Sequence, residues 1–453
     1  MVADIGKTHS RLALFARDGR LVARKSRRNA RPVPAPWLPL DTAATGDWLI
    51  AALAEFSDFP VAAIMPVAHG AGVAGLAGDS LAFAPLDYEW PIPDGLMADY
   101  RAGRDCFAIT GSPALPGGLN LGSQLHYLES CGMLAGVTLL PYAQYWAWLL
   151  SGAAASEVTS LGCHSDLWQP GAGDFSPMAR RRGWAGRFAP LVHAGSIIGT
   201  LRPDIARRTG LSSGVAIHAG LHDSNAALLA ARAFPEIAGQ EATVLSTGTW
   251  FVAMRNPGEP VDLAALPEAR DCLVNVAVDG RPVPSARFMG GREIELLGAR
   301  IDRAGTDGLA AALSAGAMVL PALVPGCGPY PAHRHCWIAE PGDPAVRSAA
   351  AALYAALMAD SALDLIGAKE RLVIEGRFAG SELFTRALAA LRPDTAVYTA
   401  EGEADVSFGA LRLVDPQLRP AATLRRAAPL AADLTSYRAI WREHTSTQRE
   451  QTA

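Results

Sequence analysis

A strand–turn–strand unit occurs twice in this sequence, and this repetition constrains the fold more than any other feature. The first unit places VADIG before a turn at Gly6 and the alternating segment SRLALFA after it. The second is TVLSTGTWFVAM (243–254), with Gly248 at the turn. Each unit opens a region in which strand-like and helix-like segments follow one another. The sequence therefore predicts an α/β protein with two similar halves, joined near residues 233–241.

The composition indicates a folded protein without a strongly charged surface. The 453 residues are 50% hydrophobic and 19% charged, which excludes an intrinsically disordered chain and supports a large buried core. The formal net charge is only −4. A charge so close to balance provides no basic field for nucleic acid or for an anionic membrane surface, so we expect neither partner.

The cysteines and the first residues both indicate a cytoplasmic protein. The six cysteines are scattered without a CxxC pair, so we expect reduced thiols. The first residues are strand-like and lack the basic and apolar regions of a secretory signal. The uncharged segment 308–332 is long enough to cross a bilayer, but prolines and glycines interrupt it. We interpret it as a short helix, a buried strand and a Gly/Pro-rich loop.

Two well-known motifs match in their letters but not in their surroundings. GKT (6–8) is the end of a P-loop motif, yet a strand-like segment follows it where a helix is required. GLSSG (210–214) matches the G-x-S-x-G elbow of serine hydrolases. A helix-like segment precedes it and a strand-like one follows, which reverses the order that the elbow needs. We therefore reject both readings.

Four other motifs fit phosphate chemistry. In DIGKTHSR (4–11), Asp4 lies at a strand end before a turn whose backbone N–H groups can form an anion nest, and Lys7 adds a point charge. The alternative is an ordinary hairpin with a capping aspartate. In GLHDSNAA (220–227), Asp223 lies at a strand-to-helix junction, where the alternative is a simple helix N-cap.

The other two motifs lie in the second half of the chain. LSTGTW (245–250) is a hydroxyl-rich turn that suits a polyphosphate, although a plain β-turn is the alternative. IEGRFAGS (374–381) joins a strand to a helix through glycines, which lets a flat ring approach the backbone closely. A routine helix start is the alternative for this segment.

Together, in this order and spacing, the four motifs resemble those of the FGGY family of carbohydrate kinases. The resemblance extends from Asp4 to about Gly409, in the segment FGAL (408–411). It implies an α/β fold with two actin-like (ribonuclease H-like) domains that face a central cleft. We expect an N-terminal sugar-binding and catalytic domain over 1–235, a C-terminal nucleotide-binding domain over 236–440, and a polar tail over 441–453 that frays.

The resemblance also implies a role for each motif in ATP-dependent phosphoryl transfer. Asp223 takes the place of the catalytic base, and Asp4 and Asp223 are the expected partners of Mg²⁺. Lys7 departs from the threonine that many members have at its position. The residues expected to hold ATP and the transferred phosphate are Gly6, Lys7, Thr8, Arg11, Ser246, Thr247, Gly248, Thr249, Gly376, Gly380 and Ser381.

The sugar pocket is expected in the first half, at polar residues beside apolar strands or in short loops. For each residue alone, a structural role is an equal alternative. The predicted substrate residues are His69, Gln124, His164, Asp166, His222 and Asp223.

These expectations amount to an ATP-dependent kinase acting on a small ketose or polyol. Within the family, the motifs DIGKTHSR, HDSNAA and STGTW look closest to members that act on deoxyketoses such as L-fuculose or L-rhamnulose. The expected partner is the sugar itself, and a homodimer is left open. The alternative is a non-catalytic sugar sensor on the same fold, against which Asp223 argues because a sensor needs no base.

Overall fold

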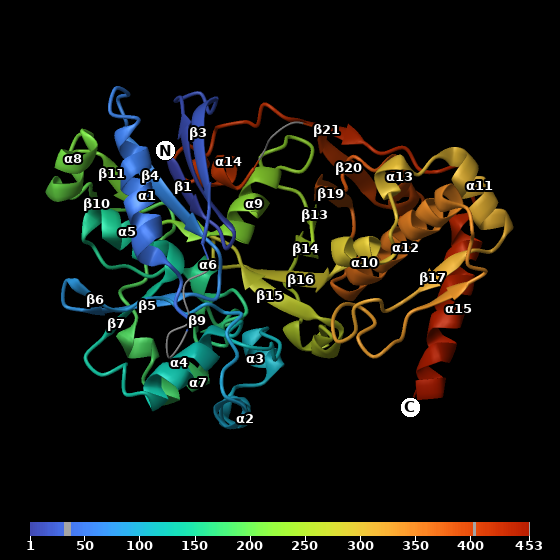
Figure 1. Cartoon of the computed structure of the whole chain (residues 1–453), viewed down its shortest axis with the longest axis horizontal. Coiled ribbons are helices and arrows are strands. Elements are labelled where there is room, and N and C mark those ends of the chain that lie inside the picture. The colour runs from blue at the N-terminus through green and yellow to red at the C-terminus, as the bar shows by residue number, and fades with distance from the viewer. Residues whose placement is uncertain (31–37, 402–404, 453) are drawn as a thin grey trace. The chain divides into compact units, whose positions relative to one another are not determined.

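The computed structural model describes residues 1–30, 38–401 and 405–452 (Figure 1). Contacts divide the chain into two compact units, and neither unit is one continuous stretch. The first unit comprises Met1–Ala233, Val274–Pro282 and Ala404–Ala421, and the second comprises Phe234–Leu273, Val283–Glu403 and Ala422–Ala453.

The first unit is built on a seven-stranded sheet with the order β10-β11-β4-β1-β2-β3, in which β12 also pairs with β4. The first three strands form an antiparallel meander, whereas β1, β11 and β12 run parallel to β4. The strands are β1 (Val2–Ile5), β2 (His9–Phe15), β3 (Leu21–Arg28), β4 (Ala63–Ala68), β10 (Ile197–Thr200), β11 (Ala216–His218) and β12 (Leu221–His222).

Helices cover both faces of this sheet because its central strands are apolar on both sides. Ile5 and Ile64 belong to one core cluster, together with residues of α1, α5 and α8. Val2, Met65 and Val67 belong to another, together with residues of α9 and α14. This division follows the period of two in a strand. The helices are α1 (Thr42–Ala54), α5 (Tyr142–Ser151), α8 (Pro203–Thr209), α9 (Asp223–Ala231) and α14 (Val406–Leu411).

A smaller part of the first unit surrounds a three-stranded sheet with the order β6-β5-β7. Its core cluster includes Trp184 and Leu128, both fully buried. The elements of this part are β5 (Val73–Ala77), β6 (Ser80–Phe83), α2 (Asp94–Gly103), α3 (Phe107–Thr110), α4 (Leu121–Ser130), β7 (Thr138–Pro141), α6 (Val158–Leu161), β8 (Trp168–Gln169), β9 (Asp174–Phe175) and α7 (Pro177–Arg181).

A seven-stranded sheet with the order β15-β16-β14-β13-β19-β20-β21 belongs mainly to the second unit, although residues 274–276 of β15 are assigned to the first. Here β13 pairs antiparallel with β14 and parallel with β19, which repeats the pattern of β1 with its neighbours β2 and β4. The strands are β13 (Ala242–Thr247), β14 (Phe251–Asn256), β15 (Cys272–Val276), β16 (Pro282–Phe288), β19 (Arg371–Gly376), β20 (Ala396–Glu401) and β21 (Thr423–Arg426).

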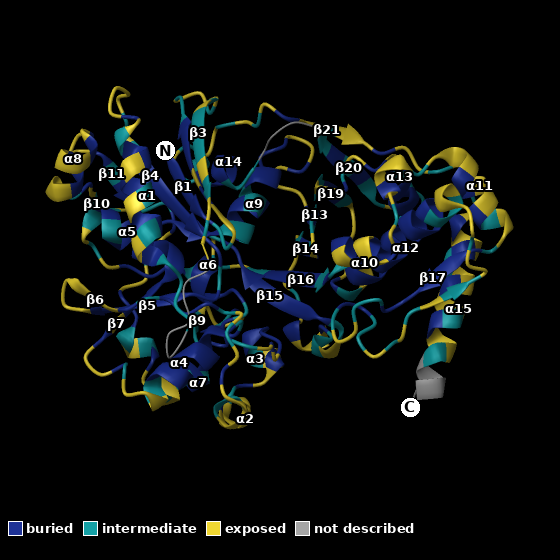
Figure 2. Cartoon of the chain, in the orientation of Figure 1, coloured by how far each residue is buried: buried dark blue, intermediate teal, exposed yellow. Residues whose placement is uncertain are grey.

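The helix α12 (Pro344–Leu365) forms much of the core of the second unit (Figure 2). It is long and apolar enough to cross a membrane by length and composition, but 83% of its apolar window is buried inside the protein. The other elements of this unit are α10 (Gly290–Leu296), α11 (Thr306–Ser314), β17 (Met318–Leu320), β18 (Cys336–Ile338), α13 (Glu382–Leu391) and α15 (Leu434–Thr452).

The structure confirms the two predicted hairpins. It also confirms that GKT (6–8) is not a P-loop and that GLSSG (210–214) is not a nucleophile elbow. Strand β2 follows GKT where a P-loop needs a helix, and α8 and β11 flank GLSSG in the order that excludes the nucleophile elbow. The segment 308–332 contains part of α11, strand β17 and a loop, as expected.

The expectation of a frayed tail from Trp441 is wrong. The helix α15 runs through this segment, and its buried residues Leu434, Tyr437, Trp441 and Thr445 recur at helical spacing. The indole Nε1 of Trp441 donates to the carbonyl of Val319 at 2.7 Å. Polar residues between these positions hide the apolar stripe in the sequence.

Candidate functional site

Three parallel strands of the first unit end at the same edge of its sheet. Ile5 of β1 and His222 of β12 both lie in register with Ala68 of β4. Because the carboxyl ends of parallel strands meet at one edge, the residues that follow them come together there. These residues are Gly6, His69 and Asp223.

Asp4 lies beside this edge on β1. Its side chain is buried, and its Oδ2 accepts a hydrogen bond from Arg11 Nη1 at 3.2 Å across the β1–β2 pair. Burial, followed by the negative charge of Asp223, raises the pKa of Asp4 to about 6. Two carboxylates close enough to repel one another fit a divalent cation, which would relieve that repulsion.

Asp223 is the first residue of α9, and His222 occupies the N-cap position. Its Oδ1 accepts hydrogen bonds from Ser224 N at 2.7 Å and Ser224 Oγ at 3.3 Å, and lies 3.2 Å from His222 Nε2. Burial raises the pKa of Asp223, although 31% of the side chain is exposed. No residue that the structure describes donates a hydrogen bond to Oδ2, so this oxygen is available to a ligand.

His222 is buried behind Asp223. Its Nε2 lies 3.3 Å from Cys163 Sγ, and its Nδ1 lies 3.3 Å from the side-chain nitrogen of Asn225. Burial lowers the pKa of His222 to about 4, so the imidazole is neutral at physiological pH. With Asn225 donating to Nδ1, the ring proton lies on Nε2, which is hydrogen-bonded to the sulfur of Cys163.

Lys7 has partners that the sequence did not identify. Its ammonium group pairs with Asp87, lies 3.9 Å from Glu89 Oε2, and sits 4.1 Å above the ring of Tyr88. The ring of His69 packs edge-on against the same tyrosine at 5.5 Å. The sequence feature that could have indicated these partners is the segment DYE (87–89), in which two acidic residues flank an aromatic one.

Gln124 and His164 make hydrogen bonds to the backbone of the first unit. Gln124 donates to the carbonyls of Ala71 and Gly118 at 2.8 and 2.6 Å. The Nδ1 of His164 lies 2.7 Å from the carbonyl of Leu119. That these two side chains contact a substrate stays a prediction.

The carboxylate of Asp166 is engaged by a cation and a phenol. Arg104 contacts both of its oxygens, at 2.8 and 3.2 Å, and Tyr100 donates to Oδ2 at 2.5 Å. A direct sugar contact by Asp166 also stays a prediction, and these bonds argue for a supporting role.

The predicted phosphate turn of the second unit is tied to the segment after β19. The hydroxyl of Thr247 donates to the carbonyl of Glu375 at 2.5 Å and accepts from Phe378 N at 3.0 Å. Gly376 has φ +85°, and a Cβ there would lie 2.4 Å from the carbonyl oxygen of Thr247. Only glycine fits this position, so two motifs that are distant in the sequence pack backbone against backbone.

Gly291 is buried against the same turn, and the sequence did not identify it. A Cβ at Gly291, in the first turn of α10, would lie 2.0 Å from the carbonyl oxygen of Gly248. The sequence feature that could have identified it is the pair of adjacent glycines, Gly290 and Gly291, after strand β16. Ser381 is buried and donates to the carbonyl of Ile301 at 2.8 Å, whereas the space beside Gly380 is open.

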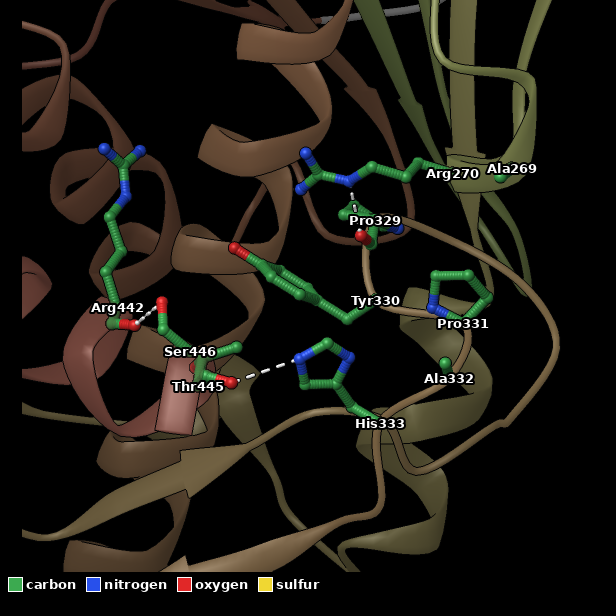
Figure 3. A pocket seen from close by; sticks show the side chains of 10 residues that line it. All are labelled: Ala269, Arg270, Pro329, Tyr330, Pro331, Ala332, His333, Arg442, Thr445 and Ser446. Atoms are coloured by element: carbon green, nitrogen blue, oxygen red, sulfur yellow. Dashed lines mark hydrogen bonds between the residues drawn. The ribbon is translucent and has the colours of Figure 1, made fainter. Parts of the chain in front are cut away.

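A cavity of about 610 Å³ lies elsewhere in the second unit (Figure 3). Three segments line it: Ala269 and Arg270, the loop from Pro329 to His333, and α15. No predicted site residue lines this cavity. The side chain of Arg270 is held over the ring of Tyr330 at 5.4 Å.

Known structures match the whole chain. The structure of a carbohydrate kinase from Novosphingobium aromaticivorans is 58% identical, with a TM-score of 0.96, and the match covers 99% of this chain and 98% of that one. A xylulose kinase from Rhodospirillum rubrum and a glycerol kinase from Plasmodium falciparum with ADP are 17% and 11% identical, with TM-scores of 0.76 and 0.79. Each match covers at least 97% of both chains, and together they confirm the two-domain, actin-like α/β fold of sugar kinases.

Sequence comparisons point the same way. Residues 239–422 match the model for the C-terminal domain of FGGY carbohydrate kinases. An L-fuculokinase of Salmonella typhi is 30% identical over 291 residues, which span 59% of this chain but only 58% of that relative. An L-fuculokinase of Escherichia coli K12 is 27% identical over 56% of each chain. The chain belongs to the FGGY family of carbohydrate kinases.

Proposed function

We propose that this protein is an ATP-dependent sugar kinase that phosphorylates a hydroxyl group of a small ketose or polyol. The observation that carries the proposal is the carboxylate of Asp223, which presents an open oxygen beside Asp4 at the edge of the first sheet. The family supports the reaction, and the L-fuculokinase relatives support a deoxyketose of the L-fuculose or L-rhamnulose type.

In this reaction Asp223 acts as the general base. Ser224 donates two hydrogen bonds to Oδ1, so Oδ2 is left to accept the proton of the sugar hydroxyl. As the sugar oxygen bonds to the γ-phosphorus of ATP, the bond from that phosphorus to the bridging oxygen breaks and ADP leaves. The raised pKa of Asp223 makes it a better proton acceptor than an ordinary aspartate.

The residues of the site fit Mg²⁺ and a nucleotide. Asp4 and Asp223 would hold Mg²⁺, which neutralises phosphate charge when bound. In the first unit, Gly6, Thr8 and Arg11 would contact the transferred phosphate through N–H groups and the guanidinium. Lys7 would contribute there while Asp87 holds its ammonium in place.

In the second unit, glycines let the backbone pack closely around the predicted phosphate turn. A Cβ at Gly376 or Gly291 would collide with the carbonyl oxygen of Thr247 or Gly248, so neither position can take a side chain without moving the turn. We propose that the turn residues bind the nucleotide phosphates and that the segment after β19 flanks the adenosine. The residues concerned are Ser246, Thr247, Gly248, Thr249, Gly376, Gly380 and Ser381.

The sugar would lie near His69 and His222, which both adjoin Asp223. The electrostatic influence of Asp223 reaches His69, and His222 contacts Asp223 directly. We infer that the protein works in the cytoplasm, where ATP is available, and a homodimer is left open as its assembly. Light scattering during size-exclusion chromatography tests the second point.

A coupled assay for ADP release tests the proposed function. Purified protein is given ATP, Mg²⁺ and one of four acceptors: L-fuculose, L-rhamnulose, D-xylulose or glycerol. We expect the fastest ADP release with L-fuculose or L-rhamnulose, and loss of that release in Asp223→Asn. Sugar binding by calorimetry without any turnover would instead identify the sensor.

A further inference from the structure

The hydroxyl group of Thr159 is the centre of a buried chain of hydrogen bonds behind the proposed base. It donates to Glu157 Oε2 at 2.6 Å and accepts from the backbone N–H of His222 at 3.0 Å. A hydroxyl has a single proton, so the bond to Glu157 turns a lone pair toward His222. Thr159 and Glu157 are both fully buried, so water does not compete for these bonds.

Glu157 fixes the orientation of that hydroxyl. Its Oε1 accepts from Thr159 N at 2.9 Å and its Oε2 from Ser160 N at 3.2 Å, as the N-cap of α6. Three bonds from one short segment leave the carboxylate no freedom to rotate. The hydroxyl of Thr159 is therefore held in one rotamer, and the amide of His222 meets a preformed acceptor.

The same segment holds the side chain of His222 as well as its backbone. Cys163, two residues after the end of α6, places its sulfur 3.3 Å from His222 Nε2. His222 is the N-cap of α9, and Asp223 follows it directly. Thr159 and Cys163 therefore both hold His222, and the position of His222 fixes the position of the Asp223 side chain that follows it.

We propose that Thr159 is a positioning residue for phosphoryl transfer. By holding the backbone N–H of His222, it places the start of α9 so that Asp223 Oδ2 meets the sugar hydroxyl. This inference rests on the proposed function, because it needs Asp223 to be the base. Geometry at a reacting centre is sensitive: a displacement of about 1 Å can cost about 100-fold in rate.

The test compares Thr159→Val, which loses the hydroxyl, with Thr159→Ser, which keeps it. We expect Thr159→Val to lower kcat by about 10- to 100-fold with little change in KM, and Thr159→Ser to restore most of the rate. The matched control is Thr209→Val, which removes another buried hydroxyl, at the end of α8, and is expected to keep the wild-type kcat.

A double-mutant cycle with Asp223→Asn separates positioning from general damage. If Thr159 acts through Asp223, Thr159→Val causes no further loss of rate in the Asp223→Asn background. Wild-type kcat in Thr159→Val, or an equal loss in both backgrounds, would overturn the inference.

Hydrogen–deuterium exchange gives a readout that does not depend on turnover. The amide of His222 is expected to exchange at least about 10-fold faster in Thr159→Val, and not in Thr159→Ser or Thr209→Val. Unchanged exchange in Thr159→Val would overturn the inference even if turnover fell. A wild-type protein without sugar-dependent ADP release would instead refute the proposed function, so the two failures are distinguishable.

Discussion

At the residue scale, the proposed chemistry depends on the carboxylate of Asp223. Replacing it by asparagine keeps an oxygen that can accept from Ser224 N, so α9 should begin as before. The carboxamide cannot accept the sugar proton, and we expect Asp223→Asn to lower kcat by about 10²- to 10⁴-fold. The measurement is steady-state ADP release, with melting temperature and sugar binding as controls for folding. Wild-type turnover in the folded variant would contradict the assignment.

The burial of Glu293 predicts how the stability of the protein depends on pH. It is buried in α10, where Tyr354 donates to Oε2 at 3.0 Å, and burial raises its pKa from 4.5 to about 7. The folded state therefore binds the proton more tightly than the unfolded state. The resulting stability is present below pH 4.5 and is lost as pH rises through 7, by about 2 to 3 kcal/mol between pH 5 and 8.

Glu293→Gln tests this sign. Glutamine keeps an acceptor for Val324 N, and the rotatable hydroxyl of Tyr354 can accept from its amide. Urea unfolding at pH 5 and pH 8 should show a smaller loss of stability in the variant than in the wild type. An equal loss in both proteins would mean that Glu293 titrates normally.

At the element scale, α14 packs against α9 at a point where only glycine fits. A Cβ at Gly409 would lie 1.8 Å from the carbonyl oxygen of Ala226, which is a backbone atom and cannot turn aside. We expect Gly409→Ala to destabilise the first unit by at least about 1 to 3 kcal/mol, because overpacking forces the two helices apart. Denaturant unfolding measures this change.

Gly95→Ala is the matched control for that substitution. Gly95 lies in α2 of the same unit, and nothing lies within 4 Å of a Cβ added there. Alanine should stabilise this position by about 0.4 to 1 kcal/mol, since it restricts the unfolded chain. The same chemical change thus has opposite expected signs at the two positions. Equal effects would refute the close contact at Gly409.

At the scale of the whole molecule, the first unit needs segments from later in the chain. The segment Val274–Pro282 supplies Val276, whose side chain packs closely against Gly162. A Cβ added at Gly162 would lie only 2.4 Å from that side chain. Ala404–Ala421 supplies α14, which covers α9. We therefore expect a fragment of residues 1–235 not to fold cooperatively. Near-ultraviolet circular dichroism and thermal unfolding, with the full chain as control, would show this, and a sharp transition in the fragment would contradict it.

Several elements and residues of the candidate site could be recognised from local patterns. A turn glycine between alternating segments marked both hairpins, and Asp4 and Asp223 were visible because each lies at the end of an apolar strand. Strand alternation, turn glycines and helix starts depend on neighbouring residues, so a short window of sequence contains them. The same reasoning failed for α15, because its apolar positions are separated by polar residues.

Other features depend on which distant segments meet. Lys7 pairs with Asp87, Thr159 holds His222, and α14 returns to the first unit although it comes from the end of the chain. No local pattern marks these pairs, because their residues are ordinary polar or glycine positions in their own segments. Packing of helices on the two sheets brings them together, and burial then makes each hydrogen bond or close contact specific. Local backbone preference thus determined the elements and the motif residues, whereas tertiary packing alone decided their partners.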